Sequence, residues 1–597
     1  MAIVPLAKLT LVGLPTDKPA VLHSLQQAGC LHLISMTDDG KQKPTLGEGT
    51  LQAHEALKYL ESSPVKRPET THPTDFQFST VVEEAVGLQA KQRELSDERD
   101  SLSNAIQVVG PWGNFRVPSA EELAGQRLWF YQLPPNALEK LASSNLIYSV
   151  VQSDQRHARV VVISPTEPAG VPGTRIDLDP RSLTELSQRK DHIEAQLERL
   201  LLDRAALTRW ITLIKREINA ADDLAHLHLA GSQTLDTNHY FVAQAWAPWD
   251  GVPAIQKIAD QHRIALEVAQ PTDDENPPTL LRNPEFLAGG QSAVTFYLTP
   301  GYRWWDPSLV VLFSFAVFFA MIISDFGYSA LLAIVLGFLW KSLGKTVDGR
   351  RLRNLTLILV GFSLVWGVIV GSYFGIAPPK DSFLGKLVLI DTTNLNQMML
   401  LSIIVGASHL VIANAITAWR TKSSIKVLVP VGWIMAIVGG LLFGMASYDQ
   451  LGKGFGTIGS WLLTIGIPLA IFMNSDQPLP PRSIWHVLGR LGDGVKNLMA
   501  VSAAFGDTLS YLRLFALGLS GAQLASTFNK LAVDSVQAFG ALGLILAIVI
   551  ILVGHSLNFV LGIMGGVIHG LRLNCIEFFN WCATEEGYPF RAFSKKA

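Results

Sequence analysis

The feature that most constrains this chain is a succession of long apolar segments in its C-terminal half. A helix needs about 20 mostly apolar residues to cross a bilayer. Candidate spans cover residues 308–324, 326–341, 354–376, 397–418, 427–447, 458–474, 497–532 and 537–584. Because the last two are too long for a perpendicular crossing, we expect them to tilt or to project from the membrane. The sequence therefore predicts a polytopic membrane domain of about eight spans over residues 300–597.

The charges between these segments predict the orientation of the domain. Lys and Arg gather in the loops at 341–353, 420–426 and 482–496, whereas the intervening loops hold Lys380, Lys386 and Lys453. Positive charge accumulates on the cytoplasmic side of membrane proteins. We therefore expect an integral membrane protein with an even number of spans and with both termini in the cytoplasm.

Arg513 lies near the centre of the seventh apolar segment. An arginine at that depth costs a few kcal/mol, and its side chain stays charged at any physiological pH. It needs a partner, water or a function. The alternative to a functional role is a structural ion pair with an acid of the same chain. Asp507, six residues away and on a different helix face, is a poor partner, and Glu577 is the other candidate. Since intramembrane charges usually mark functional sites, we interpret Arg513 as a residue of ion translocation.

The last apolar segment also carries polar side chains, which suggest a hydrated path beside Arg513. They are His555, Asn558, His569, Arg572 and Glu577. Arg572 has an alternative interpretation, because near the cytoplasmic end its side chain could reach the membrane surface.

Two further polar residues of the apolar half have simpler interpretations. Asp325 stands beside Gly327 between two apolar segments, so we interpret it as a turn residue rather than an ion ligand. His409 either lines a cavity or is an interior histidine with its hydrogen bonds satisfied.

Residues 1–290 read as a cytoplasmic α+β domain. Two separated β-α-β patterns, within about 1–75 and 235–275, are expected to pair into one ferredoxin-like lobe. Their expected strands are 7–13, 30–36, 238–248 and 263–270, and their expected helices are 19–28 and 252–261. A second α/β lobe is expected over about 110–178. It would contain strands 127–133, 147–151 and 158–164 and a helix at 136–142.

A heptad pattern connects the two lobes. Apolar residues recur every seventh position at Leu186, Ile193, Leu200, Leu207 and Ile214, and an upstream series at Val81, Leu88, Leu95 and Leu102 has the same spacing. Sustained a/d periodicity is typical of coiled coils. We predict two antiparallel coiled-coil helices over about 80–107 and 181–220; the alternative is amphipathic helices packed on an ordinary core.

Composition and motifs exclude several classes of function. The 48 Lys and Arg balance 50 Asp and Glu, which argues against a nucleic-acid-binding protein. The chain contains no phosphate-binding GxxxxGK[ST] loop, no HExxH and no GxSxG motif, so it should not hydrolyse ATP on its own. Its three cysteines form no zinc-binding spacing. We predict no catalytic residues, no cofactor and no metal site.

Several segments resemble one family of membrane proteins. They are SYLRLFALGLSGAQLA at 510–525, ISDFGYSALL at 323–332, HGLRLNCIEFF at 569–579 and EGYPFRAF at 586–593. These segments resemble the large membrane subunit of V-type and A-type rotary ATPases, called subunit a in eukaryotes and subunit I in many prokaryotes. The modest length and GDTLSYLRL are more similar to prokaryotic members, which implies a plasma (inner) membrane location.

The resemblance implies a non-catalytic stator with two half-channels for protons or sodium ions. Arg513 would face carboxylates on a rotating proteolipid ring, with Arg572 and His569 nearby. The coiled coil would bind peripheral-stalk subunits of the E/G type, and other subunits of the complex would be partners as well. Residues that would line the half-channels are Glu577, His555, Asn558, Gln523 and Ser510.

The sequence departs from the eukaryotic pattern at two positions. Gly521 stands where eukaryotic members have a histidine, and Gly562 stands where they have a glutamate. These departures leave the half-channel residues and the choice between proton and sodium open. Two other functions remain alternatives: a secondary transporter with a cytoplasmic regulatory domain, and a membrane-anchored scaffold whose coiled coil is its working part.

Overall fold

The computed structural model describes most of the chain. The described residues are 2–37, 48–72, 74–142, 146–154, 157–390, 394–447, 452–475, 477, 483–582 and 585–596. They form two compact units, and each is described by itself. One unit holds Thr10–Ala245, Pro253–Glu267 and Ala592–Ala597; the other holds Met1–Leu9, Trp246–Val252 and Val268–Arg591.

A five-stranded sheet unites segments from both ends of the N-terminal half. Its strands run in the order β2-β8-β1-β9, and β7 pairs with β8. The strands are β1 (Leu6–Gly13), β2 (His32–Ile34), β7 (Leu235–Asp236), β8 (Phe241–Pro248) and β9 (Ala265–Ala269). The helices α1 (Lys18–Ala28) and α7 (Val252–His262) complete the two β-α-β patterns. The strands of both patterns thus share one sheet.

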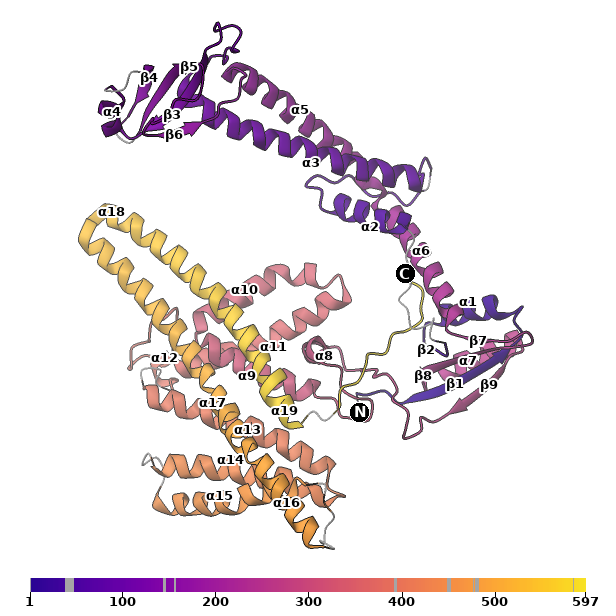
Figure 1. Cartoon of the computed structure of the whole chain (residues 1–597). Helices are drawn as coiled ribbons and strands as arrows, with labels where there is room; N and C mark the ends of the chain where they lie inside the picture. The colour runs from indigo at the N-terminus through magenta and orange to yellow at the C-terminus, as the bar shows by residue number, and fades with distance from the viewer. Residues whose placement is uncertain are drawn as a thin grey trace. The chain divides into compact units, whose positions relative to one another are not determined.

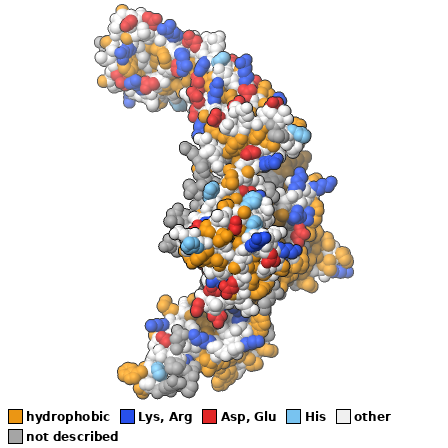
Figure 2. Space-filling model, turned by 90° about the vertical axis from the view of Figure 1, so that its right-hand side faces the viewer, with side chains coloured by type: hydrophobic (Ala, Val, Ile, Leu, Met, Phe, Trp, Pro, Cys, Tyr) orange, Lys and Arg blue, Asp and Glu red, His pale blue; other side chains and the backbone are white. Residues whose placement is uncertain are grey.

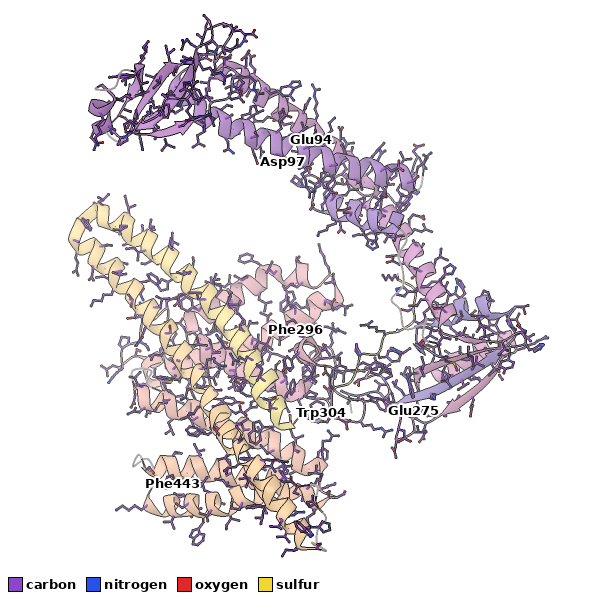
Figure 3. All side chains as sticks on the ribbon, viewed as in Figure 1. Glu94, Asp97, Glu275, Phe296, Trp304 and Phe443 are labelled. Carbon is purple, nitrogen blue, oxygen red and sulfur yellow. The ribbon has the colours of Figure 1, made fainter. Side chains whose placement is uncertain are left out.

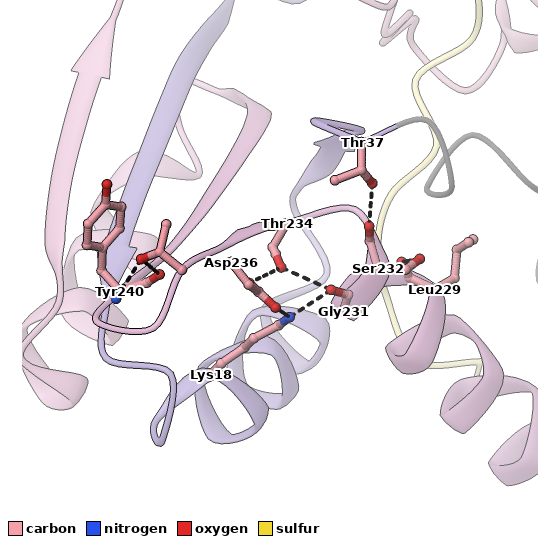
Figure 4. Close-up of polar contacts among 9 residues, drawn as sticks. Lys18, Thr37, Leu229, Gly231, Ser232, Thr234, Asp236 and Tyr240 are labelled. Carbon is pink, nitrogen blue, oxygen red and sulfur yellow. Dashed lines mark hydrogen bonds and ion pairs between the residues drawn. The ribbon is translucent and has the colours of Figure 1, made fainter.

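Polar contacts join strand β7 of this sheet and the start of α1 to the end of α6 (Ile211–Ser232), the helix that precedes β7 in the chain (Figure 4). Lys18 Nζ donates to Gly231 O at 2.7 Å and pairs with Asp236 Oδ2 at 2.6 Å. Thr234 Oγ1 donates to the other oxygen of Asp236 at 2.8 Å. These contacts satisfy a backbone carbonyl at the end of α6, which would otherwise lack a partner within its helix.

A second sheet forms a separate core farther along the chain. Its antiparallel strands run in the order β4-β5-β3-β6, and α4 (Leu138–Ala142) belongs to the same region. They are β3 (Arg127–Leu133), β4 (Ile147–Ser153), β5 (Ala158–Ser164) and β6 (Thr174–Ile176). Leu133, Val160 and Val162 are fully buried. The three longer strands lie where the sequence predicted them, and β6 adds a fourth.

The heptad residues bring two long helices together. The helices are α3 (Phe78–Val109) and α5 (Leu183–Leu207), which lie side by side in Figure 1. Leu95 and Leu102 of α3 share one buried cluster with Leu186 and Ile193 of α5. Asn114, just beyond α3, forms two hydrogen bonds with Thr184, at the start of α5. Because the end of α3 thus meets the start of α5, the two helices are antiparallel.

The second heptad helix is interrupted within its expected range of 181–220. A 3₁₀ turn at Thr208–Trp210 separates α5 from α6. Thr208 is buried, and its hydroxyl donates to Ala205 O and accepts from Arg67 N. Since these bonds fix a side chain at the junction, they stabilise the turn against a continuous helix.

Beyond that turn the two-helix arrangement becomes a three-helix one. Helix α2 (Glu48–Glu61) was not expected from the sequence. Ile211, Ile214 and Ile218 of α6 pack with α2 and with the first turns of α3. Arg204, which interrupts the heptad, stacks on the Tyr59 ring at 4.0 Å. The late heptad positions therefore face α2 as well as α3.

The other unit consists mainly of apolar helices. They are α8 (Ala288–Tyr297), α9 (Ser308–Ile323), α10 (Phe326–Leu343), α11 (Val347–Val370), α12 (Phe383–Lys386), α13 (Leu395–Arg420), α14 (Leu428–Ser447), α15 (Lys453–Met473), α16 (Ile484–Asn497), α17 (Met499–Ser510), α18 (Leu512–Arg572) and α19 (Phe579–Cys582). On the face drawn in Figure 2, hydrophobic side chains dominate over much of this unit, whereas charges of both signs crowd around α3 and α5. Figure 3 shows the same contrast between Phe443 on α14 and Glu94 and Asp97 on α3.

Among the described residues, six helices are long and apolar enough to cross a membrane. The last is a continuous run at Ile484–Cys582 that includes both of the final expected spans, and α9 is apolar but 16 residues long. Within α18 the chain reverses at Gly540, whose φ of 56° and ψ of −124° are not helical. The two arms of α18 run next to each other in Figure 1. The number of eight spans stays a prediction.

Candidate functional site

Arg513 lies within the helical run Ile484–Cys582, two residues after a one-residue interruption of its helical assignment. Helix α17 ends at Ser510, α18 begins at Leu512, and Tyr511 lies between them. Tyr511 is fully buried, and its hydroxyl lies 2.8 Å from His409 Nδ1 on α13. Gly406 lets the Tyr511 ring approach, because a Cβ at that position would clash with it. Arg513 therefore follows a firmly anchored residue.

The acidic partner of Arg513 within the chain is Glu577. Arg513 Nη1 and Glu577 Oε1 are 3.8 Å apart, and the two side chains are 23% and 3% exposed. At that separation the two groups form an ion pair without a hydrogen bond, because charge-assisted hydrogen bonds are near 2.7–2.9 Å. Arg513 Nη1 and Glu577 Oε2 have no hydrogen-bond partner among the described residues.

Glu577 lies in a π-helical turn, Leu573–Phe578, which follows α18 directly. Turns of this kind are rare and occur often at functional sites. Neighbours on both sides hold the turn in place. Asn574 accepts a hydrogen bond from Ser314, and the Phe578 ring stacks on His409 with centroids 4.5 Å apart. No sequence pattern indicated this turn.

Asp507, the other acid considered for Arg513, has a different partner. Its Oδ2 accepts a hydrogen bond from Trp581 Nε1 at 2.8 Å. Trp581 in turn packs edge-on against Trp433 of α14. Asp507 therefore contributes to packing between α17 and the chain's last helical segment, in agreement with its interpretation as a poor partner for Arg513.

A polar network connects α10 with both arms of α18. Tyr328 Oη lies 2.7 Å from His555 Nδ1 and accepts from Asn558 Nδ2 at 3.0 Å. His555 Nε2 lies 3.0 Å from Asn529 Oδ1, and Asn558 Nδ2 also donates to Gly521 O at 2.9 Å. The structure thus brings together two of the predicted polar residues, His555 and Asn558, and adds Tyr328 and Asn529.

A small cavity of about 100 Å³ lies beside this network. Tyr328 and Asn558 line it, and so do Gly521 and Gly562, the two positions that depart from the eukaryotic pattern. Because a glycine has no side chain, space remains at both positions. Tyr328 belongs to the ISDFGYSALL segment, but nothing in that segment identified its hydroxyl as a site group.

The remaining predicted residues are spread around this region. His569 is half-buried on α18, and Arg572, the last residue of α18, is exposed. Gln523 is exposed, and Ser510 donates to Gly506 O within its own helix. The hydrogen bonds described for Gln523 and Ser510 do not connect either residue to the Tyr328 network.

Asp325 has the role of a turn residue. Its Oδ1 accepts from the backbone N–H groups of Tyr328 and Phe374, both at 3.0 Å. Its Oδ2 accepts from Ser372 Oγ at 2.6 Å and from Gly375 N at 2.9 Å. With four donors on two oxygens, the carboxylate caps α10 and closes the loop that follows α11, which leaves it poorly suited to bind an ion.

Within the described part of the chain, no group of three or more His, Cys, Asp or Glu side chains has a metal-binding arrangement. The absence of a cofactor stays a prediction.

Comparison with known proteins gives a consistent result. A profile of the V-type ATPase 116 kDa subunit family matches residues 180–357 and 500–595, and the second range contains Arg513, Arg572 and Glu577. The V-type ATP synthase subunit I of Chlamydia pneumoniae is 28% identical over 491 residues, which are 70% of each chain. That of Borreliella burgdorferi is 24% identical over 627 residues, 99% of each chain.

An archaeal relative and a solved structure extend the comparison. The A-type ATP synthase subunit I of Methanocaldococcus jannaschii is 27% identical, over 68% of this chain and 64% of its own. A crystal structure of the cytoplasmic N-terminal domain of subunit I, homolog of subunit a, of V-ATPase aligns with 44% of this chain and 99% of its own, at 16% identity and a TM-score of 0.22. The family profile and these relatives in bacteria and archaea support the assignment of the chain to the V-type ATPase 116 kDa subunit family.

Proposed function

We propose that this chain is the non-catalytic stator and ion-channel subunit of a V/A-type rotary ATPase, and that it conducts protons or sodium ions along a rotating proteolipid ring. The observation that carries the proposal is Arg513, a permanent charge in an apolar helical run, loosely paired and partly open. The match to the family profile and the names of the relatives support the assignment to such a complex.

In this proposal Arg513 attracts an ionised carboxylate of the ring. The attraction is strong because the surroundings have a low effective dielectric constant. Since arginine does not deprotonate, it favours the ionised carboxylate and promotes release of the bound ion. The fixed positive charge also repels cations and so prevents a leak between the two half-channels. His569 and Arg572 would extend this positive region along α18.

Polar residues on the arms of α18 would line the access paths for the ion. We assign His555, Asn558 and Tyr328 to one path, because their hydrogen-bonded groups lie beside the small cavity at Gly521 and Gly562. We assign Glu577, the ion-pair partner of Arg513, to the other path. Hydrogen-bonded side chains of this kind can pass a proton or take part in the hydration of an ion.

The N-terminal half would connect the membrane domain to peripheral-stalk subunits. Helix α3 has 32 residues, which corresponds to roughly 48 Å at 1.5 Å per residue. Paired with α5, it could bind an elongated partner such as a stalk of the E/G type and resist torque. The clusters of Lys and Arg at 341–353 and 420–426 support a plasma-membrane orientation with both termini in the cytoplasm.

The test is Arg513→Ala in the complete complex reconstituted into vesicles. We expect ATP-driven ion uptake to be lost while the complex still assembles. Arg351→Ala is the matched control, because Arg351 also forms a 3.8 Å ion pair, with Asp348, but at an exposed position. Uptake by Arg513→Ala at the rate of the control would refute the proposal. Purification without a proteolipid ring or an ATP-hydrolysing head would instead favour a secondary transporter.

A further inference from the structure

The looseness of the Arg513–Glu577 pair is itself informative. The two groups attract each other at 3.8 Å, yet neither uses the other to satisfy its hydrogen-bonding capacity. A buried carboxylate with no hydrogen bond on Oε2 is costly, and so is an arginine without a close partner. A pair selected for stability would close to the bidentate contact that arginine and carboxylates commonly form. This pair stays open.

The two members of the pair differ in how firmly they are held. Glu577 is buried in a turn whose neighbours Asn574 and Phe578 contact Ser314 and His409. Arg513 has a long side chain, and about a quarter of it is exposed. The carboxylate is therefore the fixed member and the guanidinium the movable one. Arg513 can turn toward a group outside the chain without disturbing the packing around Glu577.

Other acids near this site do not compete for Arg513. Asp507 accepts a hydrogen bond from Trp581, and the two oxygens of Asp325 accept four hydrogen bonds from α10 and from the loop after α11. Among the described residues, the one acid that forms an ion pair with Arg513 is Glu577. The π-helical turn is thus associated with a single available negative charge.

We infer that Glu577 is a positioning residue for Arg513: it is the intrachain counter-ion that holds the guanidinium between successive ring carboxylates and gives it up when the next one arrives. This inference rests on the proposed function. An arginine left unpaired in an apolar environment after each step would be costly, and one paired to a single ring carboxylate would release it slowly. Glu577, as a second and weaker partner, reduces both the cost of an unpaired arginine and the delay in releasing the ring carboxylate. Arg513 then exchanges a ring carboxylate for the Glu577 carboxylate and never stays unpaired.

The inference predicts a kinetic effect for Glu577→Gln, which keeps the size of the side chain and removes its charge. Arg513 would then hold each ring carboxylate longer, so ATP hydrolysis and ion uptake should slow together. Coupling energies of close charge pairs start near 1.5 kcal/mol, which corresponds to roughly a tenfold lower turnover. The number of ions moved per ATP should not change, since Arg513 remains to prevent the leak.

The experiment compares four variants of the complete complex in vesicles, with ATP hydrolysis and ion uptake measured on the same preparations. Glu577→Gln should be slow but coupled, and Glu577→Asp, which keeps the charge, should recover most of the turnover. Glu586→Gln is the control, because this exposed glutamate lies nine residues farther along the chain. Arg513→Ala tests the proposed function separately.

Each outcome is decisive. Wild-type turnover of Glu577→Gln beside a transport-dead Arg513→Ala would overturn the counter-ion role and leave the proposed function standing. Failure of Glu577→Gln to assemble would make Glu577 a structural residue and also overturn the inference. Uptake by Arg513→Ala would instead overturn the proposed function itself.

Discussion

Two buried carboxylates, one in each unit of the chain, have cationic partners far away in the sequence. Asp222 on α6 is 3% exposed and pairs with Lys596 Nζ at 2.7 Å, while the backbone N–H of Lys596 donates to Asp223 at 2.9 Å. Glu577 is similarly buried but pairs with Arg513 at 3.8 Å, without a hydrogen bond. The first pair is closed by a hydrogen bond and the second is open, which indicates a structural role for one and an exchange role for the other.

The surroundings of the two pairs reinforce this contrast. The segment that carries Lys596 is itself held: Phe593 is buried, and its N–H donates to Leu31 O at 2.6 Å. Gly29, with a φ of +64°, lies against Ser594. Burial therefore fixes Asp222, and these contacts fix the backbone at Lys596, although half of the Lys596 side chain is exposed. In the Glu577 pair burial fixes the acid, but no hydrogen bond holds the Arg513 guanidinium on it.

The largest effect is expected from reversing the charges of each pair. The double variant Arg513→Glu, Glu577→Arg should transport no better than Arg513→Ala. Its new arginine lies in the anchored π-helical turn, and position 513 carries a negative charge in place of the original positive one. Ion uptake in reconstituted vesicles measures this.

Asp222→Lys combined with Lys596→Asp should restore much of the stability that either single change removes, because the backbone at both positions is held in place. Hydrogen exchange of α6 in the complete chain measures that stability. If the double variant at 513 and 577 regained uptake, the Arg513–Glu577 pair would tolerate charge reversal as the Asp222–Lys596 pair does. The proposed difference between a structural pair and an exchanging pair would then be wrong.

A smaller effect is expected from Lys596→Ala. This change leaves Asp222 buried without its cation and should lower the local stability of α6 by about 1–2 kcal/mol, discounted because half of the Lys596 side chain is exposed. Hydrogen exchange of α6 again provides the measurement. Lys595→Ala is the control, since Lys595 approaches exposed His23 at 3.4 Å. Equal losses in the two variants would mean that Asp222 needs no counter-ion.

The features that could be predicted from the sequence are those with a local signal. Leu186 and Ile193 on α5, and Leu95 with its neighbours on α3, belong to seven-residue repeats that can be read within a few helical turns. Their shared buried cluster was therefore foreseeable. Arg513 was recognisable because a permanent charge conflicts with its apolar neighbours. Glu577 could be recognised as a candidate partner because Asp507 lies on a different helix face, although the geometry of the contact was not foreseeable.

The features that escaped prediction depend on contacts between distant segments or on backbone geometry. Tyr328 meets His555 across 227 positions, and Lys596 meets Asp222 across 374. No periodicity relates such pairs. The π-helical turn differs from the preceding helix by its hydrogen-bond pattern and has no distinctive composition, and the 3₁₀ turn at Thr208 depends on a hydroxyl that bonds to Arg67.

The smallest effect is expected at an ion pair that is short but exposed. Arg189 of α5 lies 2.8 Å from Glu98 of α3, closer than Arg513 lies to Glu577, yet both side chains are exposed. Water competes for exposed charges, so Arg189→Ala should cost the coiled coil only about 0.2–1 kcal/mol. Hydrogen exchange of α3 and α5 measures this, with Ile193→Ala, expected to cost about 2–5 kcal/mol, as the reference for a buried contact. A loss at Arg189 as large as that at Lys596 would show that distance determines the strength of these pairs. A small loss would show that burial does, which is why the long pair at Arg513 can matter more than the short one at Arg189.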